Sequence, residues 1–413
     1  MSDQDQVKPP SPVTAASKGV AAVALDDDSA FKPSPTSGIP TQNGNEAAHE
    51  ITEDPSTWPP FLPTPGADLD DASIPMRLRM IHHIKSLQTT ICSALETFEP
   101  TARFQSSYYL RDASKGFGDS RVLQGGETFE KAGCSISVIK STLSVASVHQ
   151  MRAERFDWWD GVSELPYFVA GCSCVIHPSN PHAPTTHFNN LYTYRYFEIT
   201  NPAEPNGPPK AWWFGGGTDL TPSYLYDNDA KLFHQCFKDA CDKHDTAYYP
   251  AFKKWCDKYF YIPHRHEVRG IGGIFFDDLA DGSPEDLFRF IRDCSNAFLP
   301  SYYPIIQRRR LQPFTEEEKK WQQLRRGHYV EFNVRSSPST SVWGAEVDRR
   351  LAFQIMIDRG TKFGLQMKDP RTESILMSLP LTARWEYQPE QGTIEGTPEK
   401  RLMDVVQNPI EWV

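Results

Sequence analysis

No run of 18 apolar residues occurs in the 413-residue sequence, which argues against a transmembrane helix. Excess positive charge is also missing: the formal net charge is −10 at pH 7, so a general nucleic-acid-binding surface is not expected. The glycine pattern of a P-loop is absent, and RGIGGIFFDDL (269–279) does not have the G-x-G-x-x-G spacing of dinucleotide-binding proteins. These absences argue against three large classes of protein.

Cysteine spacing gives no sign of a metal knuckle or a disulfide scaffold. The chain contains eight Cys, and the pairs Cys172/Cys174 and Cys236/Cys241 do not have the usual zinc spacing. A chain of this length does not need disulfides to be stable. We therefore expect all eight to be reduced and structural.

The first 72 residues are low in arginine and in large apolar side chains. They are rich in Pro, Ser, Ala, Asp and Glu and contain three Lys and no Arg. Such a composition predicts disorder, and it shows neither the apolar core of a signal peptide nor the basic character of a transit peptide. We expect a disordered tail over 1–72, a single domain over 73–413 and a cytoplasmic location.

What the sequence does contain is a block order of strands and helices. Ser73 and Pro75 mark a helix start, followed by apolar residues at helical spacing from Met80 to Leu95. Helical patterns are predicted at 227–261 and 284–311, and strands at 134–148, 165–177, 194–200, 211–216, 270–279, 327–333 and 373–380. Blocks of this kind favour an α+β fold, with a mainly antiparallel sheet and helices packed on its faces.

The segment HPSNPHAPTTHFN (177–189) follows an apolar strand and contains His177, His182 and His187. Imidazoles on an ordered loop can act as acid/base groups or bind a metal. The alternative is a rigid polar loop whose imidazoles bond to the backbone. Metal binding is the less favoured interpretation, because no carboxylate stands at ligand spacing.

Two glycine-rich segments are followed by Asp. The first segment is AWWFGGGTDLTP (211–222), in which three successive Gly precede Asp219 and would let the backbone approach a ligand closely. The alternative is a bulge or corner of the chain that ends in Asp219 as a cap. Asp277 and Asp278, in the segment RGIGGIFFDDL (269–279), could pair with cations, but a cap on a strand end is the favoured interpretation. Cations beside predicted strand ends suit an anionic substrate, since Arg grips a carboxylate with two hydrogen bonds; they are Arg195, Arg359, Lys362 and Arg371. The residues alone thus indicate an α+β enzyme for an acidic small molecule.

Taken together, these segments resemble the oxygen-dependent coproporphyrinogen III oxidases from about residue 120 onward. The resemblance rests on the joint order of VLQGGETFEKAGCSISV, HPSNPHAP, AWWFGGGTDLTP, KKWCDKYFYIPHR, RGIGGIFFDDL, RRGHYVEFN, DRGTKFGL and RTESILMSLPLTARWEY. It implies a flat antiparallel sheet between helices, in a homodimer. It also implies that two propionates of coproporphyrinogen III become vinyls, with molecular oxygen as co-substrate and no flavin, haem or obligatory metal.

The resemblance also implies roles for individual residues. Asp219 matches the residue that contacts the pyrrole N–H groups, His187 matches a proton donor, and Arg195 matches a residue that holds a propionate or polarises the site. Further substrate contacts are implied at Ser173, Asn189, Arg359, Lys362 and Arg371. The residues matching metal ligands proposed in bacterial relatives are His177, His187, His234 and His264, and we do not expect a metal there. Asp219→Ala is expected to abolish turnover while leaving the fold.

The sequence departs from the family pattern at three places. Lys115 and Phe117 interrupt a run of four Gly, which suggests a narrower pocket. Residues 190–193 separate Asn189 from Tyr194, which the family joins directly, and this insertion predicts a shift of strand register before Arg195. Residues 334–354 are 21 extra residues, interpreted as a retained intron or a surface insertion.

Two other functions remain open at this stage. A divergent paralogue would decarboxylate another acidic substrate, as the altered glycine run suggests. A non-catalytic porphyrin-binding protein, or the misfolded product of a wrong gene model, is the third interpretation.

Overall fold

The computed structural model of the chain describes residues 68–112, 115–149, 156–188, 194–201, 203–204, 207–333 and 372–413. All of these ranges lie within one compact unit, Trp58–Val413. Residues 1–67 of the tail predicted over 1–72, and the extra segment 334–354, lie outside the described residues.

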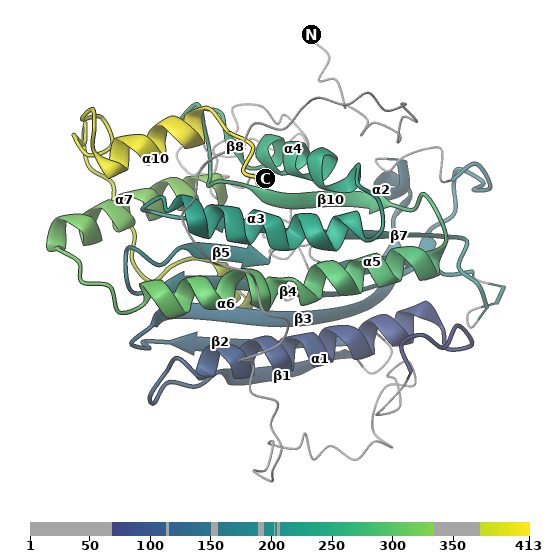
Figure 1. Ribbon diagram of the computed structural model, residues 1–413. Coiled ribbons are helices and arrows are strands. Elements are labelled where there is room, and N and C mark those ends of the chain that lie inside the picture. The colour runs from purple at the N-terminus through teal and green to yellow at the C-terminus, as the bar shows by residue number, and fades with distance from the viewer. Residues whose placement is uncertain are drawn as a thin grey trace, which may run out of the picture. The chain divides into compact units, whose positions relative to one another are not determined.

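Eight of the described strands form one antiparallel sheet in the order β1-β2-β3-β4-β5-β7-β10, with β6 pairing both β4 and β7 (Figure 1). Their bounds are β1 Gln105–Asp112, β2 Gly116–Gln124, β3 Phe129–Leu143, β4 Leu165–Pro178, β5 Thr185–Phe188, β6 Arg195–Ile199, β7 Ala211–Thr221 and β10 Gly273–Leu279. The strands expected at 165–177, 194–200, 211–216 and 270–279 are thus confirmed. The one expected at 134–148 starts earlier and stops at Leu143, before the short helix α2 (Val145–His149).

Strand register confirms that extra residues stand before Arg195. His187 of β5 pairs with Asp219 of β7, and Arg195 of β6 pairs with Gly215 of the same strand. Seven residues separate His187 from Arg195, whereas three separate Asp219 from Gly215, so four residues are in excess. An even excess leaves side-chain alternation unchanged, and Arg195 therefore emerges on the same face of the sheet as His187 and Asp219.

Helices cover one face of the sheet, which we call the core face. They are α1 Met76–Glu96, α3 Asp227–Asp242, α5 Pro284–Asn296 and α6 Phe298–Arg309, with α4 Tyr248–Tyr259 packed along β10 (Figure 1). Apolar residues from the helices and from alternate strand positions form the main buried cluster, among them Ile84, Ile136, Phe214 and Phe276. This period-two burial is what a sheet packed on helices requires.

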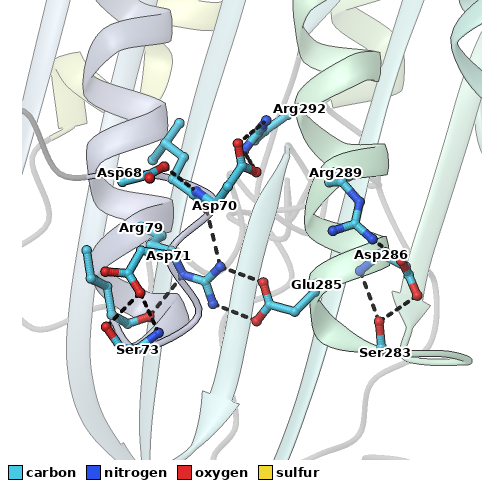
Figure 2. Close-up of polar contacts among 12 residues, drawn as sticks. Asp68, Asp70, Asp71, Ser73, Arg79, Ser283, Glu285, Asp286, Arg289 and Arg292 are labelled. Carbon is cyan, nitrogen blue, oxygen red and sulfur yellow. Dashed lines mark hydrogen bonds and ion pairs between the residues drawn. The ribbon is translucent and has the colours of Figure 1, made fainter.

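Helix α1 begins three residues later than Ser73, with Pro75 as its N-cap and no side-chain cap. The Ser73 hydroxyl instead donates to Asp71. Figure 2 shows how this entry to the domain is fastened: buried Arg79 donates to both oxygens of Glu285 on α5 and to the carbonyls of Leu69 and Ile74. The guanidinium therefore joins α1 to the first turn of α5.

The strand predicted at 327–333 is wrong, because this segment is the end of helix α7 (Glu316–Asn333). Thr315 and Glu318 form a reciprocal capping box: each side chain accepts from the other residue's backbone N–H, at 2.7 and 3.2 Å. Trp321, Leu324 and Phe332 are buried at helical spacing. The aromatic and β-branched composition of GHYVEFN had pointed to a strand, but the cap and the period of the preceding residues determine a helix.

The strand predicted at 373–380 is also wrong: it is a short helix, α9 (Thr372–Ile375), followed by the 3₁₀ turn η3 (Leu376–Ser378). Its carbonyls are satisfied by side chains rather than by a neighbouring strand. Lys131 donates to the carbonyls of Leu376 and Leu379, and Tyr329 donates to that of Ser378. The remaining described elements are α10 (Pro398–Gln407) and the hairpin β8 (Tyr261–Ile262) and β9 (Glu267–Val268).

Phe117 does not narrow the opposite face of the sheet. Its side chain is buried in the core cluster, against Tyr108 at 5.8 Å between ring centroids. Gly116 must remain glycine, since its φ is +111° and a Cβ would meet the Val138 carbonyl oxygen at 2.1 Å. The interruption of the glycine run therefore contributes a core side chain. The predicted α+β class with a large antiparallel sheet and helices is confirmed.

Candidate active site

The face of the sheet opposite the core face, here called the site face, is lined by very small side chains. The strand register places Ser135 beside Ser173, Ser137 beside Gly171, and Arg195 beside Gly215. The site-face positions without bulk are Gly118, Ser120, Gly133, Ser135, Ser137, Gly171, Ser173, Gly215 and Gly217. Tyr109 lies over Gly118 and Met377 over Gly133, so the open part of this surface is the half-exposed group Ser137, Gly171 and Ser173, where a flat ligand can approach the backbone closely.

A buried polar cluster stands on this face where β5, β7 and the start of β10 meet. Asp219 accepts from Arg269 at 2.7 Å through one oxygen and contacts His187 Nδ1 at 3.2 Å through the other. Thr221 adds a longer contact of 3.4 Å. All three principal side chains are at most 3% exposed. Moving an isolated charge from water into the protein interior costs free energy, and a close partner of opposite charge offsets part of that cost. Asp219 and Arg269 therefore each need the other in order to be buried.

The electrostatics of the cluster determine the charge on each group. Burial favours the neutral form of Asp219, but Arg269 and then His187 outweigh it, so the pKa of Asp219 lies below its ordinary value. Burial, aided by Arg269, lowers the pKa of His187 to about 4 despite Asp219. At neutral pH the histidine is therefore neutral and the aspartate ionised.

Those charges decide which His187 nitrogen carries the proton. A carboxylate only accepts hydrogen bonds, so Nδ1–H must donate to Asp219, and Nε2 keeps a lone pair. Nε2 is buried and has no hydrogen-bond partner among the described residues. A neutral imidazole in this tautomer is ready to accept a proton.

Aromatic rings enclose the cluster. The Arg269 guanidinium lies 3.8 Å from the ring centroid of Phe260 and 5.0 Å from that of Phe332 on α7. Tyr329, also on α7, stacks on His187 at 4.8 Å between centroids. The end of α7 thus packs on the site face directly over the cluster, which keeps its ion pair away from water.

A second polar pair lies further along β7. Arg195 Nη2 donates to Asp277 Oδ1 at 2.6 Å, and both side chains are about nine-tenths buried. Gly215 and Asp219 are four residues apart on β7, which corresponds to about 13 Å, with Gly217 between them on the site face. The site face therefore carries the Asp219–Arg269 ion pair with neutral His187 at one end of this part of β7, and the Arg195–Asp277 pair at the other.

Four of the residues expected in the site are described, and they share one face. Asp219, His187 and Arg195 lie on the site face, and so does Ser173, half-buried on β4. The remaining expected contacts lie outside the described residues: Asn189, Arg359, Lys362 and Arg371. Sequence reasoning missed Arg269, which opens the segment RGIGGIFFDDL, because its contact with Asp219 joins segments 50 residues apart; the only local signal is a cation before a buried strand.

Three of the four histidines matched to bacterial metal ligands are occupied by other groups. His177 Nε2 bonds to the Ser378 carbonyl, His234 bonds to Tyr249 and to the Ile271 carbonyl, and His264 bonds to Glu331. Across the described ranges, no group of three His, Cys, Asp or Glu is placed to hold a metal ion. The eight cysteines are free thiols, and all but Cys236 are fully buried.

The fold is an antiparallel sheet with helices on one face, and the other face carries small side chains and a buried Asp–His–Arg cluster beneath the end of α7. Buried titratable groups with shifted pKa values that lie together in this way are typical of an enzyme's active site. The sequence profile described as coproporphyrinogen III oxidase matches residues 79–348 and 343–412. The chain belongs to the coproporphyrinogen III oxidase family.

Similarity to individual relatives extends over most of the chain. It is 46% identical over 348 residues to the chloroplastic oxygen-dependent coproporphyrinogen-III oxidase of Glycine max, covering 84% of this chain and 82% of that protein. For the enzyme of that name from Drosophila melanogaster the identity is 48%, covering 82% and 78%. For the mitochondrial enzyme of Homo sapiens it is 44%, covering 91% and 75%.

Among the helices in the described ranges, none combines the length and the apolar character needed to cross a bilayer.

Proposed function

We propose that this protein is an oxygen-dependent coproporphyrinogen III oxidase of haem biosynthesis. The observation that carries the proposal is the buried Asp219–His187–Arg269 cluster at one end of a glycine and serine face, with Arg195 at the other. In each of two steps a propionate side chain loses carbon dioxide and two hydrogens to become a vinyl group. Molecular oxygen accepts the two electrons and two protons and leaves as hydrogen peroxide, so atoms and electrons balance.

In this proposal the cluster binds the pyrrole N–H groups and moves a proton. A carboxylate has about four acceptor positions, and Arg269, His187 and Thr221 occupy three of those on Asp219. The remaining position accepts a pyrrole N–H, and the low pKa keeps the group ionised for that purpose. His187 accepts a proton at Nε2 and donates it later in the cycle.

The other end of the site face holds the acidic side chains of the substrate. Arg195 on β6 is the described cation that contacts a propionate, and Ser173 on β4 contacts the substrate from the floor. Asn189, Arg359, Lys362 and Arg371 complete the proposed set of substrate contacts. The protein's contribution is placement and electrostatics on a bare surface.

No flavin, haem or metal takes part in the proposed reaction. The engagement of His177, His234 and His264 with other groups supports this. Metal analysis and activity in the presence of a chelator are the test, and loss of activity that added metal restores would contradict the proposal.

The test of the reaction is to incubate the full chain with coproporphyrinogen III in air and, separately, without oxygen. Product is measured after oxidation as protoporphyrin IX, by fluorescence-detected chromatography. We expect product in air only. Absence of product from a folded protein would refute the proposal.

We propose a homodimer in the cytoplasm. The apolar side chains of Leu381, Trp385 and Tyr387 are 49%, 56% and 92% exposed and suit a subunit interface. Light scattering tests the dimer.

The low arginine content of 1–72 supports a cytoplasmic location, whereas the names of the plant and human relatives include an organelle. Cell fractionation decides between the two locations.

Residues 1–72 are proposed as a tail, 73–413 as one domain, and 334–354 as an insertion in it. The match to the family profile supports the insertion, because the match comes in two parts, 79–348 and 343–412, that overlap at 343–348. A retained intron and a genuine surface loop both fit that break. Mass spectrometry of the native protein distinguishes them: the tryptic peptide over 336–349 is present only if the segment is translated.

A further inference from the structure

The site face contains a second built feature, whose purpose the cluster around Asp219 does not explain. Strand β10 carries a bulge where it passes β7: Phe276 pairs with Gly216 and Leu279 with Phe214. Asp277 and Asp278 therefore both stand opposite Gly215. Asp278 takes a left-handed backbone conformation, with φ of +57°, which is uncommon outside glycine. Bulges of this kind turn a side chain in a new direction.

The side chain that this bulge directs is Asp277. Its Oδ1 accepts from the backbone N–H of Asp278 at 2.8 Å and from Arg195 Nη2 at 2.6 Å. Arg195 comes from β6, on the other side of β7. The pair therefore bridges three strands across the position of Gly215.

Both neighbours of Arg195 are glycine, and each has a steric reason. A Cβ on Gly215 would lie 3.0 Å from Arg195 Nε and 3.1 Å from Asp277 Oδ1. A Cβ on Gly171 would lie 3.1 Å from Arg195 Cβ. The side chain of Arg195 thus lies flat in a slot between two bare strands, with a buried carboxylate at its end.

We propose that Asp277 is a positioning residue for Arg195: it fixes the direction of the guanidinium over Gly215, so that the propionate meets the arginine in one orientation. This inference rests on the proposed function, because it needs Arg195 to contact the substrate. Sequence reasoning had favoured a strand cap for Asp277 and left pairing with a cation as the alternative, and the contact with Arg195 is that alternative. A charge-assisted bond to one edge of a planar guanidinium sets its plane as well as its position.

The test is a double-variant cycle with Asp277→Asn, Arg195→Lys and both together, assayed with coproporphyrinogen III in air. We expect Asp277→Asn to lower kcat/KM about tenfold or more. We expect the double variant to be no worse than Arg195→Lys alone, because Asp277 acts only through Arg195. Effects that multiply would overturn the proposal. Asp281→Asn, an exposed carboxylate just beyond β10, is the matched control and keeps the wild-type rate.

Gly215→Ala keeps the test decisive if Asp277→Asn fails to fold. The three atoms nearest to the added methyl are all side-chain atoms, Arg195 Nε and Cγ and Asp277 Oδ1, so it is expected to displace the pair rather than the backbone. We expect it to lower kcat/KM with a thermal midpoint close to that of the wild type. Wild-type kinetics in Gly215→Ala would overturn the proposal.

Binding of coproporphyrin III, measured by tryptophan quenching on the same proteins, separates this inference from the proposed function. If the wild-type protein binds coproporphyrin III but shows no turnover, the proposed reaction is refuted. The double-variant cycle of Asp277 and Arg195 is then evaluated from dissociation constants instead of kcat/KM. A wild-type protein that neither binds nor reacts overturns both.

Discussion

The single residue whose replacement has the most consequences is Asp219, because it is at once the proposed ligand of the pyrroles and the counterion of a buried cation. Removing one member of a buried ion pair leaves the other unpaired, at a cost of about 3–5 kcal/mol. Asp219→Asn is therefore expected to lose both activity and stability. This revises the expectation from sequence that Asp219→Ala leaves the fold unaffected.

A compensated variant separates the two effects. Asp219→Asn combined with Arg269→Met removes the unpaired charge and keeps the volume, and replacing a buried pair in this way is often neutral for stability. We expect urea unfolding of the double variant to approach that of the wild type. Its kcat is expected to remain lower by a factor of about 100 or more, as for the loss of one preorganised electrostatic contact to the reacting molecule. Recovery of activity would mean that Asp219 serves only to neutralise Arg269.

At the scale of elements, what the sequence predicts depends on whether local pattern or tertiary contact decides the structure. The alternating strand at 165–177 and the strand at 270–279 were predictable because burial on one face fixes their period. The end of α7 was not, because its last residues, GHYVEFN, have strand-like composition while its helical signal lies further back, in the capping box at Thr315 and Glu318.

The same distinction applies to the site. Asp219, His187 and Arg195 could be predicted as site residues from the motifs that contain them. Arg195 lies on the same face of the sheet as the other two because the number of extra residues before it is even. Arg269 and the role of Asp277 could not, because both arise from contacts across strands. The pairing of Gly215 with Arg195 on one side and a bulge on the other depends on register, which no local pattern reveals.

The junction between α1 and α5 offers a comparison of two arginines at the element scale (Figure 2). Arg79 is 2% exposed and donates to Glu285 and to two carbonyls, whereas Arg292 is 23% exposed and donates to Asp70, whose side chain is 65% exposed. We expect Arg79→Met to lower the free energy of unfolding by about 3 kcal/mol, since the carbonyls lose their donor.

Arg292→Met is the matched control for that comparison. An exposed ion pair contributes little to stability because solvent screens it, so this variant should unfold close to the wild type in urea. Equal losses for the two variants would show that exposure does not govern the strength of these contacts.

At the scale of the whole molecule, several buried histidines together make stability depend on pH. Burial lowers the pKa of His83 to about 4, of His187 to about 4 and of His234 to about 3, and it lowers that of His177 well below the ordinary value. In the unfolded chain these groups titrate near 6.5. Between the two values the unfolded state binds more protons than the folded state, so stability is fully present above about pH 6.5 and falls as the pH is lowered.

The expected result is a fall in the free energy of unfolding from about pH 6.5 downward, with up to four protons taken up on unfolding and about 1.4 kcal/mol per pH unit for each. Urea unfolding at steps between pH 7.5 and 5.5 measures the slope. His83→Gln should reduce it by about one proton, because His83 bonds only to Ser295 among the described hydrogen bonds and a glutamine does not titrate. A slope unchanged by that substitution would mean that His83 does not contribute to the pH dependence of stability in this range. Carboxylates with a lowered pKa, such as Glu267, contribute only at lower pH, because a Glu in the unfolded chain titrates near 4.5.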